Sequence, residues 1–513
     1  MHRLRDLAKQ IPIAALTLCL LQPSARATDY YVDPSGENGA YTTIQAALDA
    51  VSGQSPSNRA NVFIAPGTYV EQVTVSKPNV SIIGQGPSAE SVKVTFNSIP
   101  ISGVTFGESF TVSSSATAFS ATNLTLENST PDQNITQALA IRSSADRAAF
   151  LNVRFLGYQD TVLVDSNSRQ YFRDCFITGD TDFIFGDATA VFDNATIEST
   201  YRGYITAART ADTTPNGLVF LDCTLVKGSD RSPLDDGTTA QKNTVFLGRP
   251  WRWADAGTTP STIFIRTKMD DHITTAGWDP WGNLGDPDPV TRYSEFGSTD
   301  LNGDPLVFPT NPFGGTTGRA SWADPMTAEQ ADNYILANLF GTVSFWNDNP
   351  AAVPEGTGVT YLPQGDGQAW DPIAQLALLP SSLHGDFNND GRVDAADYTV
   401  WRDGFGTAFT QADYDDWKSH FGEGGGSAAL NSSSYTVPEP STYLMIGTAA
   451  LLCLAPCFRA ANADAAKPRT ETAAGRSPTT QRSANSNSTS VRKSVQVLSG
   501  NSCPRVFLFG GMS

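Results

Sequence analysis

Short apolar runs separated by Gly, Asn, Asp and Thr dominate the chain from residue 29 to about residue 349. Runs of this length, bounded by turn-forming residues, predict β-strands rather than helices. Several runs share one pattern, in which an Asn or Asp follows the apolar residues and another apolar residue comes three positions later. The pattern recurs at intervals of 29, 22, 20 and 28 residues, with its polar position at Asn123, Asn152, Asp174, Asn194 and Asp222.

A repeat of strands and polar turns with a period in the twenties is typical of a stacked solenoid. We therefore predict an all-β fold, a right-handed parallel β-helix, in which each coil places a strand over a strand of the previous coil. On periodicity alone, an antiparallel sandwich with regular turns stays open as an alternative. Cys175 and Cys223 occupy equivalent repeat positions, so we expect them to stack inside as small apolar residues rather than to form a disulfide.

Both ends of the chain carry segments that predict export. A basic start, an apolar run and the small residues around Arg26 predict a signal peptide over residues 1–27. Near the other end, a Pro-Glu-Pro run precedes the apolar stretch 443–458, which as a helix would reach only about 24 Å of a hydrocarbon core about 30 Å thick. This order of parts resembles a PEP-CTERM sorting segment over residues 437–459, and a transmembrane anchor is the alternative.

The composition divides the rest of the chain into five parts. Residues 28–349 form the predicted β-helix domain, 350–383 a linker and 384–424 a small helical module. Residues 425–436 predict a second, Gly/Ser-rich linker. The tail, 460–513, is polar and shows no periodicity, which predicts disorder.

The charge and the rare residue types exclude several classes of function. The chain of 513 residues carries 34 Lys and Arg against 52 Asp and Glu, so its net charge of −18 disfavours nonspecific binding to nucleic acid. The chain has only 4 His, one of them in the predicted signal peptide, which leaves little material for a Ser-His-Asp triad. We therefore expect catalysis without histidine and without a metal or other cofactor.

Two aspartates and one arginine are the candidates for chemistry. Asp160 and Asp182 lie 22 residues apart, about one coil, so we expect their carboxylates to stack on neighbouring rungs roughly 5 Å apart. Like charges at that separation raise one pKa, so that one group acts as an acid while the other stays ionised. Arg249 can hold one carboxylate deprotonated through a bidentate pair. Strand alternation predicts that Phe183 and Phe185 both point inward, leaving Asp182 on the outer surface.

A calcium loop is predicted in the small module. Asp386, Asn388, Asp390, Asp394 and Asp397 supply oxygen at positions 1, 3, 5, 9 and 12, with a glycine at position 6. This is the spacing of an EF-hand-like loop that binds Ca²⁺. The loop and the repeated Ala-Asp-Tyr helices that follow resemble a type I dockerin, whose partner would be a cohesin-like or cell-surface protein. A purely structural Ca²⁺-stabilised cap is an equal alternative.

Six motifs, in order from residue 30 to residue 341, make the main domain similar to the pectin methylesterases, or pectinesterases. They include Gly157-Tyr-Gln-Asp-Thr161, Asp182-Phe-Ile-Phe-Gly186 and Leu247-Gly-Arg-Pro-Trp251. The resemblance implies a β-helical carbohydrate esterase that hydrolyses methyl esters of polygalacturonate. Two alternatives stay open: a β-helix that only binds polysaccharide, and an esterase that acts on another acyl substrate.

The family roles transfer to matching residues of this chain. The resemblance implies that Asp182 is the nucleophile, Asp160 the general acid and base, and Arg249 the cation that keeps Asp182 ionised. It further implies that Gln137 and Gln159 stabilise the oxyanion. Trp251 and Trp278 would stack on the substrate. The implied partner is methylated pectin, outside the cell or in the cell envelope of a bacterium, with possible membrane contact through 443–458.

Overall fold

The computed structural model describes residues 28–100, 106–131, 136–228, 240–251, 255–282, 287, 291–306, 318–354, 360–380, 385–387, 392–406 and 411–422. The predicted signal peptide, sorting segment, Gly/Ser linker and tail lie outside the described residues. Among the described helices, none is long and apolar enough to cross a membrane.

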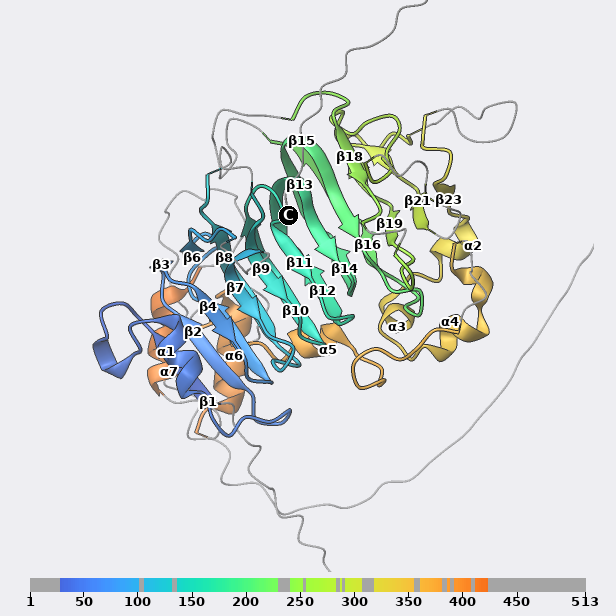
Figure 1. Cartoon of the computed structure of the whole chain (residues 1–513). Helices are drawn as coiled ribbons and strands as arrows, with labels where there is room; N and C mark the ends of the chain where they lie inside the picture. Colours follow the sequence, from blue (N-terminus) through green and yellow to red (C-terminus); the bar gives the residue numbers. More distant parts are fainter. Residues whose placement is uncertain are drawn as a thin grey trace, which may run out of the picture. The chain divides into compact units, whose positions relative to one another are not determined.

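All paired strands of the coil run parallel and form one continuous sheet (Figure 1). Their register pairs divide this sheet into three faces, which we call the first, second and third sheets. The first sheet contains β1 (Thr28–Val32), β2 (Ala60–Ile64), β5 (Val80–Gly84), the first halves of β8 (Ser120–Asn128) and β10 (Ala148–Leu156), β12 (Arg169–Arg173), β14 (Thr189–Asp193), β16 (Leu218–Leu221), β19 (Ser261–Ile265), β21 (Arg292–Phe296) and β23 (Asp324–Pro325). These pairings confirm the predicted parallel β-helix.

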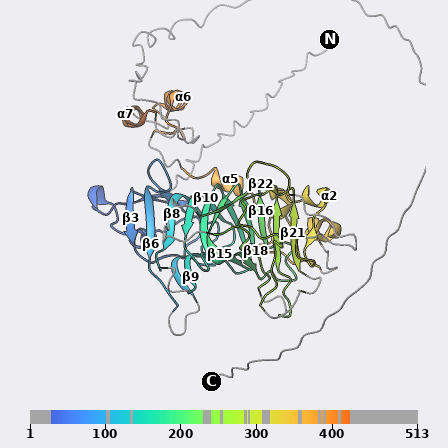
Figure 2. The same ribbon diagram turned by 90° about the horizontal axis from the view of Figure 1, so that it is seen from above.

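The other two sheets complete each coil. The second contains β3 (Gly67–Val70), β6 (Val92–Phe96), the second halves of β8 and β10, the first halves of β13 (Phe176–Gly186) and β15 (Thr196–Ala208), β17 (Thr224–Lys227), β20 (Lys268–Met269) and β22 (Thr299–Asp300). The third contains β4 (Val73–Val75), β7 (Gly107–Val112), β9 (Ala138–Ser143), β11 (Val162–Val164), the second halves of β13 and β15, and β18 (Val245–Gly248). Seen from above, successive coils stack side by side (Figure 2).

The repeated Asn and Asp positions bend the chain from the first sheet into the second. All five adopt the left-handed conformation, with φ between 52° and 57°. Asn and Asp tolerate this conformation better than other non-glycine residues, which explains why the repeat uses them. Their side chains also connect the coils, since Asn152 Nδ2 donates to Asn123 Oδ1 at 3.0 Å and Asn194 Nδ2 donates to Asp174 Oδ1 at 2.6 Å.

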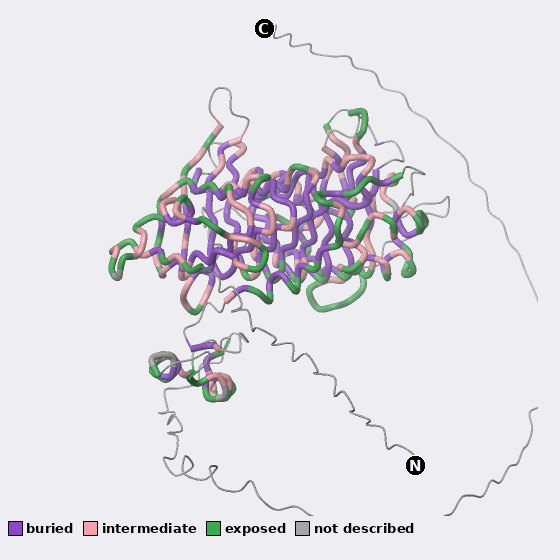
Figure 3. The backbone as a smooth tube through the Cα atoms, turned by 90° about the horizontal axis from the view of Figure 1, so that it is seen from below, coloured by how far each residue is buried: buried purple, intermediate pink, exposed green. Residues whose placement is uncertain are grey.

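The interior of the coil is apolar and closely packed, and Figure 3 shows the strands as buried and many of the connecting turns as exposed. Cys175 and Cys223 are buried free thiols, as the sequence predicts. Ala195 occupies the coil between them, so the two sulfur atoms are two rungs apart. The first coil is covered at its end by α1 (Ile44–Ala50), which Thr43 caps.

A ladder of phenylalanines runs through this interior, one ring in each coil. Adjacent rings stack with centroids 4.3 to 4.7 Å apart, in the order Phe150, Phe172, Phe192, Phe220 and Phe264. Parallel register puts identical residues on top of one another, so one side chain contacts the coils on both sides.

We expect Phe192→Ala to lower the free energy of unfolding by about 3–5 kcal/mol, because the cavity would separate two stacked rings. Phe192 has no exposed surface, so the lost contacts cannot be replaced by water. Urea unfolding measures the effect, and Phe192→Leu is the control, with a smaller loss. A loss below about 1 kcal/mol for the alanine variant would show that the ladder does not stabilise the coil.

The C-terminal part of the described domain covers the outer face of the first sheet. α2 (Ala328–Ala331), α3 (Leu336–Leu339), α4 (Ser344–Asp348) and the 3-10 helix Pro350–Ala352 lie over apolar residues that point outward from β12, β14, β16 and β19. α5 (Pro372–Leu376) packs near β10, where Gln375 Nε2 donates to the carbonyls of Phe119 and Arg147 at 2.9 and 3.1 Å.

The predicted linker over residues 350–383 is therefore wrong for its described parts, 350–354 and 360–380. The side chain of Trp370 is 8% exposed and lies 4.7 Å from the ring of Phe340, centroid to centroid. Pro and Gly in this segment indicated a linker, but Tyr361, Trp370 and Leu376 are apolar anchors that cover an exposed sheet face. The sequence pattern does not show that the first sheet is apolar on both sides.

The small module contains two helices of ten residues, α6 (Ala395–Gly404) and α7 (Gln411–His420). Aromatic side chains from both helices form its core, in which Tyr398, Trp401, Tyr414 and Trp417 contact one another. The repeated Ala-Asp-Tyr motif thus provides matching aromatic faces on the paired helices.

Candidate active site

The two candidate carboxylates lie at the corner between the second and third sheets. Asp160 comes just before β11, and Asp182 lies inside β13 where the register with β15 shifts. Val162 of β11 pairs with Ile184 of β13, so the two aspartates occupy equivalent places on adjacent coils. The backbone N–H of Asp160 donates to the carbonyl of Thr181 at 3.0 Å. The predicted stacking of the two acids is therefore present in the fold.

Both aspartates have left-handed backbones, with φ of 63° at Asp160 and 52° at Asp182. This changes the predicted alternation of side chains along β13. Phe183 and Ile184 are both in the interior, whereas Phe185 points outward and contacts Trp251. The prediction that Phe183 and Phe185 share the inner face is wrong, because a left-handed residue shifts the strand's period of two by one position.

Arg249 binds Asp182 through two hydrogen bonds. Its Nε donates to Asp182 Oδ1 at 2.9 Å and its Nη2 donates to Asp182 Oδ2 at 2.7 Å. Arg249 follows the end of β18, where its own backbone N–H donates to the carbonyl of Thr206 at 3.0 Å. The arginine and the aspartate are 67 residues apart in sequence, and stacking of β13, β15 and β18 brings them together.

The electrostatics of the two acids differ. Burial and then the charge of Asp182 raise the pKa of Asp160 to about 8, although Arg249 and a hydrogen bond with Gln159 act in the opposite direction. Burial also raises the pKa of Asp182, and the hydrogen-bonded charge of Arg249 opposes that rise. Because the guanidinium binds Asp182 bidentately, we assign the negative charge at neutral pH to Asp182 and the proton to Asp160.

The two glutamines occupy neighbouring coils at the same corner. Gln137 directly precedes β9 and Gln159 directly precedes Asp160. The backbones of these coils are joined, since the N–H of Ala138 donates to the carbonyl of Gln159 at 3.3 Å. Both side chains are half-buried, and Gln159 lines a pocket together with Tyr158, Thr181 and other residues beside the acid pair.

An apolar stripe runs along the outer face of the third sheet, next to the acids. Leu139, Leu163, Phe185 and Ala207 come from four successive coils, and Phe106, Trp251 and Trp281 pack against them. The four stripe residues are at most 3% exposed, so the half-buried rings of Phe106, Trp251 and Trp281 form the accessible part of this apolar patch.

Trp251 and Trp278 have different environments. Trp251 is half-buried at this stripe, in agreement with its predicted place beside Arg249. Trp278 is 2% exposed and packs in the core against Phe264 and Tyr293, so the predicted stacking of Trp278 on substrate is wrong. The tryptophan of the Ala276-Gly-Trp motif is therefore a residue of the core.

Two residues near Arg249 were missed from the sequence. The Cζ atom of Arg249 lies 3.9 Å from the ring centroid of Tyr204 and 4.3 Å from that of Trp281. Trp281 stands three residues after Trp278, so a second tryptophan in the same loop was the available signal. Tyr204 gave no signal, because its position relative to Arg249 depends on the pairing of β15 with β18.

The predicted calcium loop is only partly within the described residues, because Asn388 and Asp390 lie outside them. Asp394 caps α6 by accepting from the N–H of Ala396 at 2.7 Å. The carboxylate of Asp397 accepts from the N–H groups of Phe387 and Asp394, each at 2.8 Å. Asp386 and Asp397 are 5% and 0% exposed. In the part of the chain that the structure describes, no group of three or more acidic, His or Cys side chains is placed to hold a metal.

Comparisons with known proteins identify the family of the chain. The family model described as Pectinesterase matches residues 31–304. Pectinesterase 31 of Arabidopsis thaliana is 35% identical over 258 residues, which are 48% of this chain and 75% of the relative. Probable pectinesterase/pectinesterase inhibitor 17 of the same plant is 33% identical over 349 residues, but the chain spans only 62% of that relative's length.

Two solved structures share the fold. A pectin methylesterase in complex with a hexasaccharide has a TM-score of 0.50 and 26% identity, over 61% of this chain and 97% of that one. Pectin methylesterase from carrot has a TM-score of 0.50 and 25% identity, over 61% of this chain and 93% of that one. With the family model and the Arabidopsis relatives, these matches show that the chain belongs to the pectinesterase family.

Proposed function

We propose that the chain hydrolyses the methyl esters of polygalacturonate and releases pectate and methanol. The observation that carries this proposal is the pair of buried aspartates on adjacent coils, of which Asp182 is held bidentately by Arg249. A nucleophile that is ionised beside an acid that keeps its proton suits acyl transfer to water. The solved relatives are pectin methylesterases, which supports the choice of substrate.

In the first half-reaction, a carboxylate oxygen of Asp182 attacks the ester carbonyl carbon. The carbonyl π electrons move to oxygen, and the side-chain N–H groups of Gln137 and Gln159 stabilise the resulting oxyanion. When the carbonyl reforms, the bond to the methoxy group breaks, and Asp160 gives its proton to the departing methanol. The product on the enzyme is a mixed anhydride between Asp182 and the galacturonate carboxyl group.

In the second half-reaction, Asp160 has become a carboxylate and accepts a proton from water. The hydroxide equivalent attacks the acyl carbon, and the bond to Asp182 breaks with the electron pair returning to its carboxylate. Asp160 ends protonated and Asp182 ionised, so both groups regain their starting states. Asp182 loses its negative charge when the anhydride forms and regains it when the anhydride is hydrolysed. Arg249 stabilises the ionised form of Asp182 at both ends of the cycle.

Trp251, which is half-buried above the apolar stripe, would stack on the apolar face of galacturonate. The net charge of −18 also favours methylated stretches of the polymer, which carry less negative charge. Methanol release from pectin separates the alternatives. A protein that only binds polysaccharide releases none, and an esterase for another acyl group is active on that substrate instead.

For the small module, we infer a Ca²⁺ loop formed by Asp386, Asn388, Asp390, Asp394 and Asp397, in a protein that is exported. Support comes from the oxygen side chains at positions 1, 3, 5, 9 and 12, which have the spacing of an EF-hand-like Ca²⁺ loop. Calorimetric titration of the full chain with Ca²⁺ tests the loop, with Asp386→Ala as the comparison. Equal binding by both proteins, or binding by neither, would remove this inference and leave the esterase unaffected.

A further inference from the structure

Two aromatic rings lie against the guanidinium group of Arg249. Tyr204 and Trp281 contribute these rings, 3.9 Å and 4.3 Å from Cζ, while the edge of the group is bound to Asp182. We propose that Tyr204 and Trp281 are positioning residues, which hold Arg249 in the plane that gives both hydrogen bonds to the nucleophile. This proposal rests on the proposed esterase function.

Tyr204 and Trp281 together form what we call the aromatic clamp. The need for it follows from the flexibility of the arginine side chain. It has several rotatable bonds, and a rotation of the guanidinium plane would break one of the two hydrogen bonds to Asp182. Each ring in contact with the guanidinium group limits this rotation, and two rings limit it more than one does. The rings also exclude water, which strengthens the attraction between Arg249 and Asp182.

The ring of Tyr204 is itself fixed from two directions. Its hydroxyl donates to Asp279 Oδ2 at 2.9 Å, and its ring stacks on Phe246 with centroids 5.4 Å apart. Tyr204 and Phe246 are register partners in β15 and β18. The tyrosine therefore belongs to the rigid coil that ends at Arg249.

Trp281 is held by the loop that follows the core residue Trp278. Gly248 forms a bridge with Trp278, and the N–H of Asp279 donates to the carbonyl of Gly248 at 3.2 Å. Gly248 directly precedes Arg249, so the loop is attached to the strand end that carries the arginine. The buried side chain of Trp278 therefore anchors the loop that carries Trp281.

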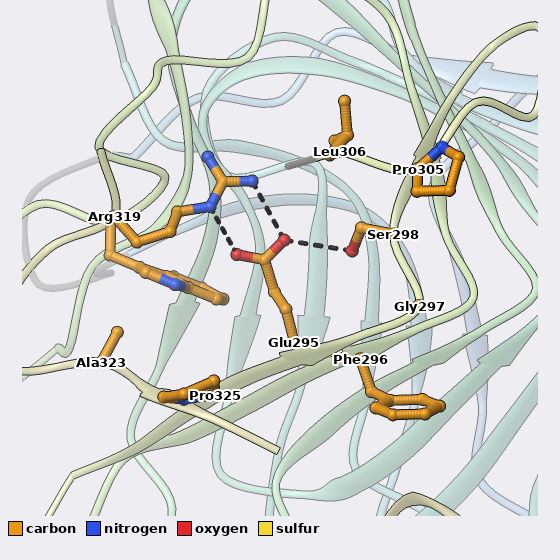
Figure 4. Close-up of a pocket in the computed structure, with 10 residues that line it drawn as sticks. Glu295, Phe296, Gly297, Ser298, Pro305, Leu306, Arg319, Ala323 and Pro325 are labelled. Atoms are coloured by element: carbon orange, nitrogen blue, oxygen red, sulfur yellow. Dashed lines mark hydrogen bonds and ion pairs between the residues drawn. The ribbon is translucent and has the colours of Figure 1, made fainter. Parts of the chain in front are cut away.

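Arg319 provides a second anchor for the segment before Trp278, and Figure 4 shows its pairing with Glu295. Arg319 pairs with Glu295, with Nε 2.8 Å from Oε1 and Nη2 donating to Oε2 at 3.0 Å. Its Nη1 also donates to the carbonyls of Thr274 and Thr275 at 2.9 and 3.1 Å. Gly277 has φ +68° and lies against Arg319, where a Cβ atom would approach the Arg319 Cδ to 2.7 Å.

The competing explanation is that Trp281 stacks on substrate. Trp251 offers a direct comparison, because it packs on the same apolar stripe and contacts Phe185 and Arg209. A substrate platform acts mainly on KM, whereas a group that positions the arginine acts on kcat. Matched alanine variants of the two tryptophans therefore separate the roles.

The experiment measures kcat and KM for methanol release from methylated pectin by the full chain. We expect Trp281→Ala to lower kcat about 10- to 100-fold with KM changed less than about threefold, because a small misplacement of a catalytic group is costly. Trp281→Phe restores a ring on that face and should recover most of the kcat. Trp251→Ala should raise KM and change kcat less.

Three results would overturn the proposal. They are a Trp281→Ala variant with unchanged kcat, one with only a raised KM, and a Trp281→Phe variant as slow as the alanine variant. Circular dichroism and thermal unfolding check each protein, and if Trp281→Ala does not fold, Tyr204→Leu against Tyr204→Phe gives the same comparison on the other face. If the wild type releases no methanol, both the esterase function and the clamp are overturned. If the wild type is active and Trp281→Ala is unaffected, only the clamp is overturned.

Discussion

Asp182→Asn should lose at least about 10⁴-fold in kcat for methanol release from methylated pectin, since an amide cannot replace a carboxylate nucleophile. Asparagine has nearly the same shape and can still accept a hydrogen bond from Arg249, so the site keeps its geometry. The protein should remain folded, although one partner of a buried ion pair has lost its charge. Methanol assays on wild type and variant measure the loss directly.

The chain contains a matched control for this variant. Asp222 also has a left-handed backbone, with φ 54°, and it binds Arg266 bidentately at 2.7 and 2.6 Å. That pair is about half exposed and lies at the corner between the first and second sheets. Asp222→Asn should leave methanol release unchanged. If Asp182→Asn keeps more than about a tenth of the wild-type kcat, Asp182 is not the nucleophile.

The comparison of the two pairs also shows what makes one of them a site. An aspartate with a bidentate arginine occurs at both corners, so the pair alone does not indicate catalysis. Asp182 is buried, a second acid occupies the adjacent coil, and an apolar stripe lies beside it. Burial and the second acid are the features that shift the pKa values and permit acid–base chemistry.

Asp160→Asn should lower kcat by about 10²- to 10⁴-fold, because the departing methanol would lose its proton donor. The same variant should change the pH dependence. The raised pKa of Asp160, about 8, means that the acid is protonated below that pH and deprotonated above it. Wild-type kcat/KM should therefore fall above about pH 8, and this alkaline fall should be absent in the variant.

A pH series of methanol release for both proteins makes the measurement. The substrate must be kept at high methylation and the assays short, because methyl esters hydrolyse spontaneously in alkali. If Asp160→Asn shows the same alkaline fall as the wild type, another group controls it and Asp160 is not the acid. If its kcat is within about tenfold of the wild type, general acid catalysis by Asp160 is excluded.

The sequence predicted the coil and the central residues because both depend on repetition. The recurring Asn and Asp positions reported the period, and a period near 22 residues placed Asp160 and Asp182 on neighbouring coils. Arg249 was the candidate cation for this pair, and the resemblance to pectinesterases then implied its role beside Asp182. The structure confirms the coil and the pair between Arg249 and Asp182.

The errors have a common cause, which is that a linear pattern does not show backbone conformation or what lies across the fold. The left-handed backbone at Asp182 reversed the direction of Phe185. Trp278 and Trp281 look alike in sequence, yet only the bridge to Gly248 shows that the first is an anchor and the second contacts Arg249. Trp370 was assigned to a linker because the apolar outer face that it helps to cover belongs to strands far away in sequence.

The division of protons between the two acids can be observed without turnover. Infrared difference spectroscopy between about pH 7 and pH 10 detects the loss of a protonated carboxyl group as it ionises. We predict such a carboxyl band in the wild type and in Asp222→Asn, and its absence in Asp160→Asn. A band of undiminished size in Asp160→Asn would show that the proton resides elsewhere and would contradict the assignment of Asp160 as the acid and Asp182 as the nucleophile.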